Sequence, residues 1–124
     1  MHNSSPITFI AWDRANLAAV RDVLAGLQRG GIYLRRGHLL METSWLGSGA
    51  RDFYATAWRW GAQDCPLFYD LARRGKLLLT ISDTVISCGS KDDIADARDG
   101  IAQVLIAAQD PQQLCGLLAD AAED

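Results

Sequence analysis

Short apolar runs bounded by turn residues alternate along this chain with segments of helical periodicity, which is the pattern of a mixed α and β protein. β-favouring runs predict strands over residues 7–12, 32–34, 39–43 and 76–82, the second and third joined as a hairpin with Gly37 in its turn. Residues 84–88 can be a hairpin partner of the last strand or a loop, because Ser82 and Asp83 supply no turn glycine.

Capping residues followed by apolar positions at helical spacing predict the helices. They cover residues 13–30, 48–61, 64–75, 90–109 and 110–118, with fraying expected from Ala119. Within 48–61, Tyr54 and Trp58 stand four residues apart, as do Phe53 and Ala57, which is the spacing of neighbours on a helix face. The resulting order is β-α-β-β-α-α-β-(β)-α-α, an α+β fold with a mainly antiparallel sheet packed by helices.

The composition fits one globular core. The 124 residues are 49% hydrophobic and 22% charged, and the chain has neither a Gly-X-Y period nor sustained heptads, which excludes disordered, collagen-like and coiled-coil chains. We therefore predict a single small domain over residues 1–124, with 1–6 and 120–124 as flexible ends.

Charge is distributed unevenly along the chain. Residues 1–76 hold ten of the twelve basic groups against six acidic ones, and residues 77–124 hold two against nine, so the two parts carry net charges of +4 and −7. Solvated helix surfaces can produce such a pattern. It also suits a domain that meets an anionic ligand on one side and a basic partner on the other.

Apolar runs and cysteines indicate the compartment. No apolar run approaches the roughly 18 residues of a membrane span, and the N-terminus has no basic start before its short apolar segment. Cys65, Cys88 and Cys115 form no C-x-x-C pair and lie far in sequence from the two histidines, which suits a reducing compartment. We expect a cytoplasmic protein with no membrane partner, no metal and no cofactor.

Two tripeptides resemble the signature of a nuclease family. Gly31-Ile32-Tyr33 is followed by Trp45-Leu46-Gly47, and the pair resembles the opening of a GIY-YIG nuclease domain. The resemblance could cover residues 31–109. It implies that the tripeptides form paired strands, and that two tyrosines, a helix arginine and a metal-binding glutamate cleave phosphodiesters.

Tyr33 matches the first tyrosine of that family, but the chain departs from the pattern at the other catalytic positions. Trp45 replaces the second tyrosine and lacks a hydroxyl, and Thr56 or Ala57 stands near the arginine position, which Arg51 or Arg59 reaches only by a shifted alignment. No glutamate lies between Glu42 and Glu123, so Asp96 or Asp99 would have to bind the metal. The resemblance therefore favours a degenerate, nucleic-acid-binding relative over an active nuclease.

Thiol chemistry is a second alternative. Cys65 stands at the start of the helix predicted over 64–75, and Cys88 lies two residues before the Ser90 cap, so helix N-termini could stabilise both thiolates for nucleophilic or persulfide chemistry. No resolving cysteine is adjacent, and no spacing ties His38 to either sulfur. Burial of both thiols in the core is the competing interpretation.

Aromatic and arginine residues interleave in the middle of the chain. On a helix, Trp58 and Trp60 lie about 200° apart, so they cannot both face the core. One of the rings, or part of it, should therefore be exposed or pack against the neighbouring hairpin. Exposed tryptophan and arginine dominate binding hot spots, although Trp60 could instead pack on Tyr69 or Phe68. The candidate partner-binding residues are Trp45, Trp58, Arg59, Trp60, Arg35, Arg36 and His38.

The motifs of common enzymes are missing from the sequence. It has no P-loop, nucleophile elbow, zinc-protease motif or dinucleotide fingerprint, and we single out no catalytic residue. We predict binding rather than turnover: an inhibitor, immunity protein, secretion chaperone or adaptor that docks another protein, with a homodimer possible. Nucleic-acid binding is the first alternative, and sulfur handling by Cys65 or Cys88 is the second.

Overall fold

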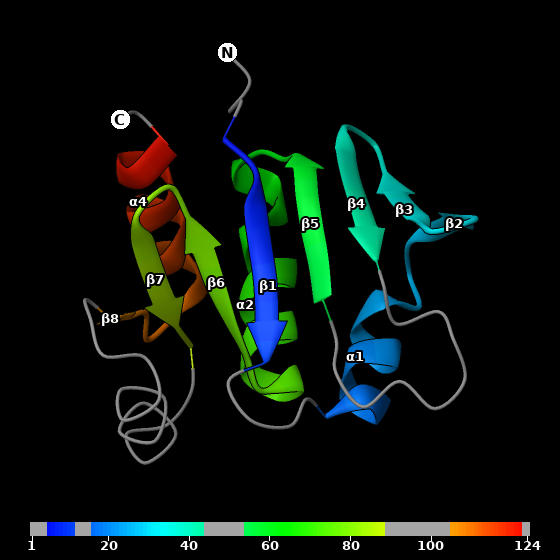
Figure 1. The fold of residues 1–124 in the computed structure, drawn as a ribbon, viewed down its shortest axis with the longest axis horizontal. Helices are drawn as coiled ribbons and strands as arrows, with labels where there is room; N and C mark the ends of the chain where they lie inside the picture. The colour runs from blue at the N-terminus through cyan, green and yellow to red at the C-terminus, as the bar shows by residue number, and fades with distance from the viewer. Residues whose placement is uncertain (1–4, 12–15, 44–53, 89–104, 123–124) are drawn as a thin grey trace.

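A single sheet organises the protein. The computed structural model describes residues 5–11, 16–43, 54–88 and 105–122, and within them eight strands lie side by side (Figure 1). The strands are β1 (Ile7–Ala11), β2 (Gln28–Gly30), β3 (Tyr33–Arg36), β4 (Leu39–Thr43), β5 (Tyr54–Arg59), β6 (Leu77–Ile81), β7 (Thr84–Ser87) and β8 (Leu105–Ala107).

The strand order combines a local meander with a long-range insertion. It is β2-β3-β4-β5-β1-β6-β7-β8, so β2 to β5 pair in sequence while β1 enters between β5 and β6. Neighbouring strands are antiparallel except β7 and β8, which run parallel. β1, the first strand of the chain, therefore lies inside the sheet, where Ile7 and Phe9 are buried.

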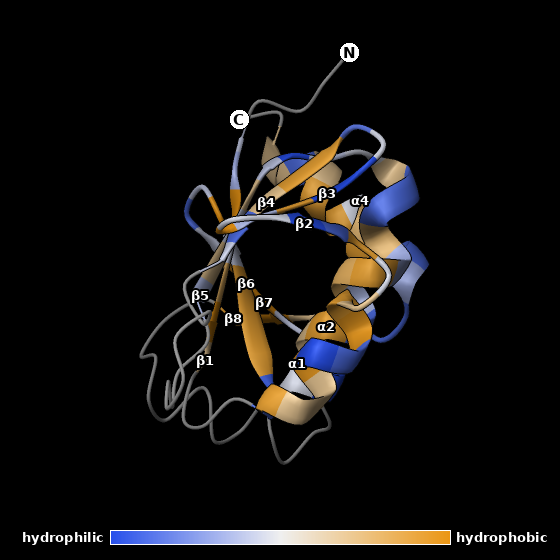
Figure 2. Cartoon of the chain, turned by 90° about the vertical axis from the view of Figure 1, so that its right-hand side faces the viewer, coloured by the Kyte–Doolittle hydropathy of each residue, from blue (hydrophilic) through white to orange (hydrophobic). Residues whose placement is uncertain are grey.

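Helices cover one face of the sheet. α1 (Leu17–Leu24), α2 (Cys65–Gly75), preceded by the 3-10 turn η1 (Ala62–Asp64), and α4 (Pro111–Ala122) all lie on the same side (Figure 2). Phe9 of β1 meets Phe68 of α2 there, with ring centroids 5.4 Å apart. The apolar core therefore lies between this face and the helices.

The predicted class is confirmed: the chain is a small α+β domain with a mostly antiparallel sheet packed by helices. The strands predicted over 7–12, 39–43 and 76–82 appear as β1, β4 and β6, and the helix predicted over 64–75 appears as α2. Asp110 caps α4 as predicted, accepting a hydrogen bond from the backbone N–H of Gln113 at 2.7 Å.

Residues 84–88, for which the sequence allows a strand or a loop, contain the strand β7 (Thr84–Ser87). β7 pairs with β6 through a turn in which Ser82 takes the left-handed conformation, with φ of 51°. Glycine or asparagine usually takes that conformation, so serine at this position makes the hairpin signal in the sequence weak.

Several element predictions are corrected. α1 is capped by Asn16 and ends at Leu24, and part of its predicted C-terminal half is β2. Residues 54–59 of the predicted helix 48–61 form β5, and residues 105–107 of the predicted helix 90–109 form β8. α4 continues to Ala122, beyond Ala119, because Ala121 is buried. The remaining residues of the predicted helices 48–61 and 90–109 lie partly outside the described ranges.

Candidate functional site

The sheet has a helix-covered face and a second face that none of the described helices covers (Figure 2). Alternate residues of a strand point to opposite faces, and paired residues on neighbouring strands share a face. Phe9, Ala55 and Leu79 are paired on the covered face, and Thr8, Thr56 and Thr80 are paired on the other.

Three exposed aromatic side chains lie on this second face. Thr56 is paired with Glu42, and Glu42 with Tyr33, so these residues form a row across β5, β4 and β3. Tyr54 and Trp58 flank Thr56 along β5, each about 7 Å from it. The exposed fractions are 36% for Tyr33, 51% for Tyr54 and 47% for Trp58. We call Tyr33, Glu42, Tyr54, Thr56 and Trp58 the aromatic face.

Glu42 contacts the largest of these rings. The Trp58 Nε1–H donates to Glu42 Oε1 at 3.4 Å, across the pairing of β4 with β5. This long, exposed bond gives the indole donor a partner while the ring stays about half exposed. The aromatic face therefore presents a tryptophan ring whose polar group already has a partner in the free protein.

An irregularity in β5 separates the two neighbouring tryptophans. Leu40 pairs with Arg59 and Met41 with Ala57, so β5 holds one extra residue, Trp58, opposite β4. Such a bulge reverses the alternation of the side chains that follow it. Trp60 therefore turns to the covered side although it stands two positions after Trp58.

Trp60 is a core residue. Its side chain is 2% exposed, its ring meets Phe68 edge-on with centroids 6.3 Å apart, and its Nε1–H donates to the Ser5 carbonyl oxygen at 2.9 Å. Trp58 is the exposed tryptophan, but the helix from which that exposure was predicted is wrong, because Trp58 lies on β5. Inclusion of Trp60 among the partner-binding candidates is corrected, because its ring fills the core.

The other candidates are divided between several places. Arg35 and Arg59 are both paired with Leu40, so the three side chains share one face of the sheet. The two arginines are exposed and lie beside the aromatic face. Arg36 instead reaches the buried carboxylate of Asp64, at 3.6 Å. His38 is half-buried in the turn between β3 and β4. Trp45 lies outside the described residues.

Four of the five members of the aromatic face were not among the predicted partner-binding residues: Tyr33, Glu42, Tyr54 and Thr56. The segment Tyr54-Ala55-Thr56-Ala57-Trp58 alternates large and small residues, which is the period of a strand with one open face. That signal was present, but the four-residue spacing of Tyr54 and Trp58 fits a helix equally well. Glu42 follows Met41 in the predicted strand 39–43, where alternation also places it outside.

The thiols do not have the electrostatics that nucleophilic chemistry needs. Cys65 and Cys88 are each 2% exposed. Burial raises the pKa of the Cys88 thiol to about 12. Burial, and then its hydrogen bond with Cys115, raises the pKa of Cys65. Both shifts oppose the lowering that a helix N-terminus would give, so burial outweighs it at Cys65, the first residue of α2.

The positions implied by the nuclease resemblance do not assemble on the described elements. Tyr33 begins β3 opposite Glu42, and Thr56, Ala57 and Arg59 lie on a strand, not on the helix that the resemblance implies. Arg51, Asp96 and Asp99 lie outside the described residues. Among the described residues, no three His, Cys, Asp or Glu side chains are placed to hold a metal ion.

No helix in the described ranges is long and apolar enough to cross a membrane. No protein-family model, no curated protein and no solved structure matches the chain. The resemblance to the GIY-YIG family therefore rests on the two tripeptides alone.

Proposed function

We propose that this chain is a non-catalytic binding domain that docks another protein on its aromatic face. The observation that carries the proposal is the exposure of Trp58 and Tyr54 on a sheet face without a described helix over it. Inhibitors, immunity proteins, secretion chaperones and adaptors are the kinds of protein that work in this way. A cytoplasmic location would suit the three free thiols.

The chemistry of the aromatic face favours a protein partner. Tryptophan and tyrosine rings bury about 150–250 Å² each and lose little side-chain entropy on binding, which is why they recur at the centres of protein interfaces. The Trp58 Nε1–H already has Glu42 as its acceptor, so an apolar partner surface can cover the ring without leaving that donor unpaired. Arg59 and Arg35 at one side supply the charged rim that fixes orientation.

Affinity capture with matched variants tests the proposal. We expect wild-type protein to retain a partner from its native cells, identified by mass spectrometry, and Trp58→Ala to lose at least about 2 kcal/mol of binding, roughly thirtyfold in affinity. Arg59→Ala should weaken binding less, and Arg73→Ala, an exposed arginine on α2, should not change it.

Thermal unfolding supplies the control for folding. Trp58→Ala should unfold near the wild-type temperature because its ring is about half exposed, whereas Trp60→Ala should lose about 3–5 kcal/mol as a buried ring is removed. A partner that binds Trp58→Ala as tightly as wild type, with both proteins folded, contradicts the proposal.

Nucleic-acid binding is the second candidate, and the placement of Arg35 and Arg59 near Trp58 favours it. Exposed rings can stack on bases while arginines contact phosphates. Glu42 at the middle of the same face repels phosphate, so we rank this candidate below a protein partner. Binding of DNA or RNA that falls steeply with salt and weakens in Arg35→Ala would establish it, and no binding at low salt would remove it.

A further inference from the structure

The sheet edge at β2 is available for pairing. β2 pairs with β3 on one side, and no strand of the described chain lies on its other side. Its three residues, Gln28, Arg29 and Gly30, are all exposed. An uncovered edge strand presents backbone N–H and C=O groups that an extended segment of another chain can bind.

The turn geometry shows which backbone groups are free. Gly31, with φ of 64°, and Ile32 form the two-residue turn between β2 and β3. In such a hairpin the closing pair, here Gly30 with Tyr33, exchanges hydrogen bonds, and the next residue directs its own groups away. Arg29 therefore offers one N–H and one C=O at the open edge.

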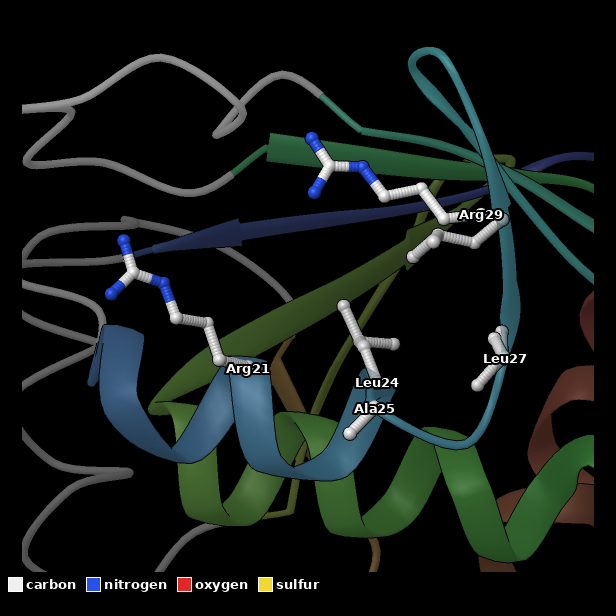
Figure 3. Close-up of a pocket in the computed structure, with 6 residues that line it drawn as sticks. Arg21, Leu24, Ala25, Leu27 and Arg29 are labelled. Carbon is white, nitrogen blue, oxygen red and sulfur yellow. The ribbon is translucent and has the colours of Figure 1, made fainter.

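A pocket lies on the helix side of this edge, between β2 and α1 (Figure 3). It has a volume of about 180 Å³ and an apolar floor made by Leu24, Leu27 and Leu34. Leu24 points from α1 toward the sheet, and the side chains of Arg21 and Arg29 extend at the rim. An engineered cavity of about 150 Å³ holds benzene, so this pocket has room for one apolar side chain.

A second pocket lies on the other side of the same edge. Its volume is about 260 Å³, and it is lined by Gln28, Arg29, Gly30 and Arg35. Gln28 is paired with Arg35, whereas Arg29 is paired with Leu34 of the covered face, so the side chains of Gln28 and Arg29 point to opposite faces. The two pockets therefore flank β2, one on each side of the sheet.

The described residues that line the two pockets carry charges of one sign, with Arg21, Arg29 and Arg35 and no acidic residue among them. Arg21 already has an interaction partner, so the charge offered to a ligand comes from Arg29 and Arg35. Asp22, the acidic residue of α1, is bound by Arg74 of α2 at 2.7 Å and does not line either pocket. Carboxylates are the groups that arginines bind most strongly in proteins, so an acidic ligand is complementary to this edge.

We propose that the β2 edge binds an extended acidic peptide segment of a partner protein as an added strand. Alternate side chains of such a strand point to opposite faces, so apolar residues enter the leucine-lined pocket and acidic residues meet Arg35. Arg29 supplies the backbone hydrogen bonds and a charge at the rim. The site contains none of the five residues of the aromatic face, but it shares Arg35 with the charged rim of the proposed function, and both sites take a protein partner.

Fluorescence anisotropy with defined peptides tests the side-chain part. The probe is a fluorescein-labelled, end-blocked peptide of alternating glutamate and valine, and its control replaces each glutamate by lysine. We expect the glutamate peptide to bind and the lysine peptide not to bind. Arg29→Ala and Arg35→Ala should each weaken binding about tenfold, and Arg73→Ala should not change it.

Backbone methylation of the probe tests strand addition itself. Methyl groups on every second amide remove donors from one edge of the peptide, so one methylated register should bind and the other should not. Equal binding of both registers, no binding of the glutamate peptide, or no effect of Arg29→Ala would overturn the proposal. Displacement of the peptide by a thymidine oligonucleotide, with the oligonucleotide binding more tightly, would assign the edge to nucleic acid and also overturn it.

The two proposals fail separately. Trp58→Ala removes a ring of the aromatic face and should leave the affinity for the peptide at its wild-type value. In affinity capture of the partner, Arg29→Ala should cause a smaller loss of binding than Trp58→Ala does. A negative result with the peptide would therefore overturn the β2-edge proposal and leave the proposal for the aromatic face untouched.

Discussion

Trp58 and Trp60 are the same residue type, two positions apart, and their environments are opposite. One is 47% exposed beside Glu42, and the other is 2% exposed against Phe68. The extra residue in β5 causes the difference, because it reverses the alternation between them. A single irregularity thus leaves one tryptophan exposed and places the other in the core.

The thiols permit a prediction at the same scale. Alkylation requires the thiolate, and Cys65 and Cys88 are buried with raised pKa values, whereas Cys115 is half-buried. We expect iodoacetamide at pH 8 to label Cys115 first in the folded protein, as mass spectrometry of the peptides would show. Faster labelling of Cys65 or Cys88 than of Cys115 would contradict this and revive a thiol function.

Cys88 also predicts a pH dependence of stability. Its pKa rises from 9.0 to about 12 on folding, so the unfolded chain loses this proton first as pH increases. The contribution of Cys88 to the free energy of unfolding is therefore complete below about pH 9 and is lost as the pH rises toward 12. Cys88→Ala should show less alkaline destabilisation than wild type.

Among the elements, the contact between α1 and α2 depends on one glycine. A Cβ added at Gly75 would lie 2.7 Å from Val20 Cγ2, and Val20 is fully buried with a stiff branched side chain. Gly75→Ala should therefore destabilise the protein by about 1–3 kcal/mol, measured by denaturant unfolding.

Gly116 is the matched control. It lies inside α4 with nothing within 4 Å of an added Cβ, so Gly116→Ala should stabilise by about 0.5–1 kcal/mol through helix propensity. Equal effects of the two substitutions would show that helix propensity, and not the approach of α1 to α2, governs position 75.

Elements with an unambiguous period were predictable, and β5 was not. Leu77–Ile81 and Cys65–Gly75 carry strand and helix signals that no other interpretation matches, and both were predicted. Tyr54 to Trp58 satisfies both a four-residue and a two-residue period. β5 forms because β1 and β4 pair with it on either side. Pairing with segments elsewhere in the chain cannot be predicted from the period of residues 54–58 alone.

For the molecule as a whole, the sequence predicted the class but not the strand order. The class follows from which elements exist, whereas the central place of β1 depends on contacts between distant segments. The same limit applies to the site. Trp58, Arg59 and Arg35 were predicted as binding residues from their types, but Tyr54 and Glu42 join them only through the pairing of strands.

We propose that a partner protein covers the face of the sheet opposite the helices. Indole N–H signals in a 15N–1H spectrum test this proposal, with Trp58 and Trp60 assigned by Trp58→Phe and Trp60→Phe. On addition of the captured partner, the Trp58 signal should shift or broaden while the Trp60 signal, from the buried ring bonded to Ser5, stays in place. A Trp58 signal that does not change while the complex forms would contradict the account.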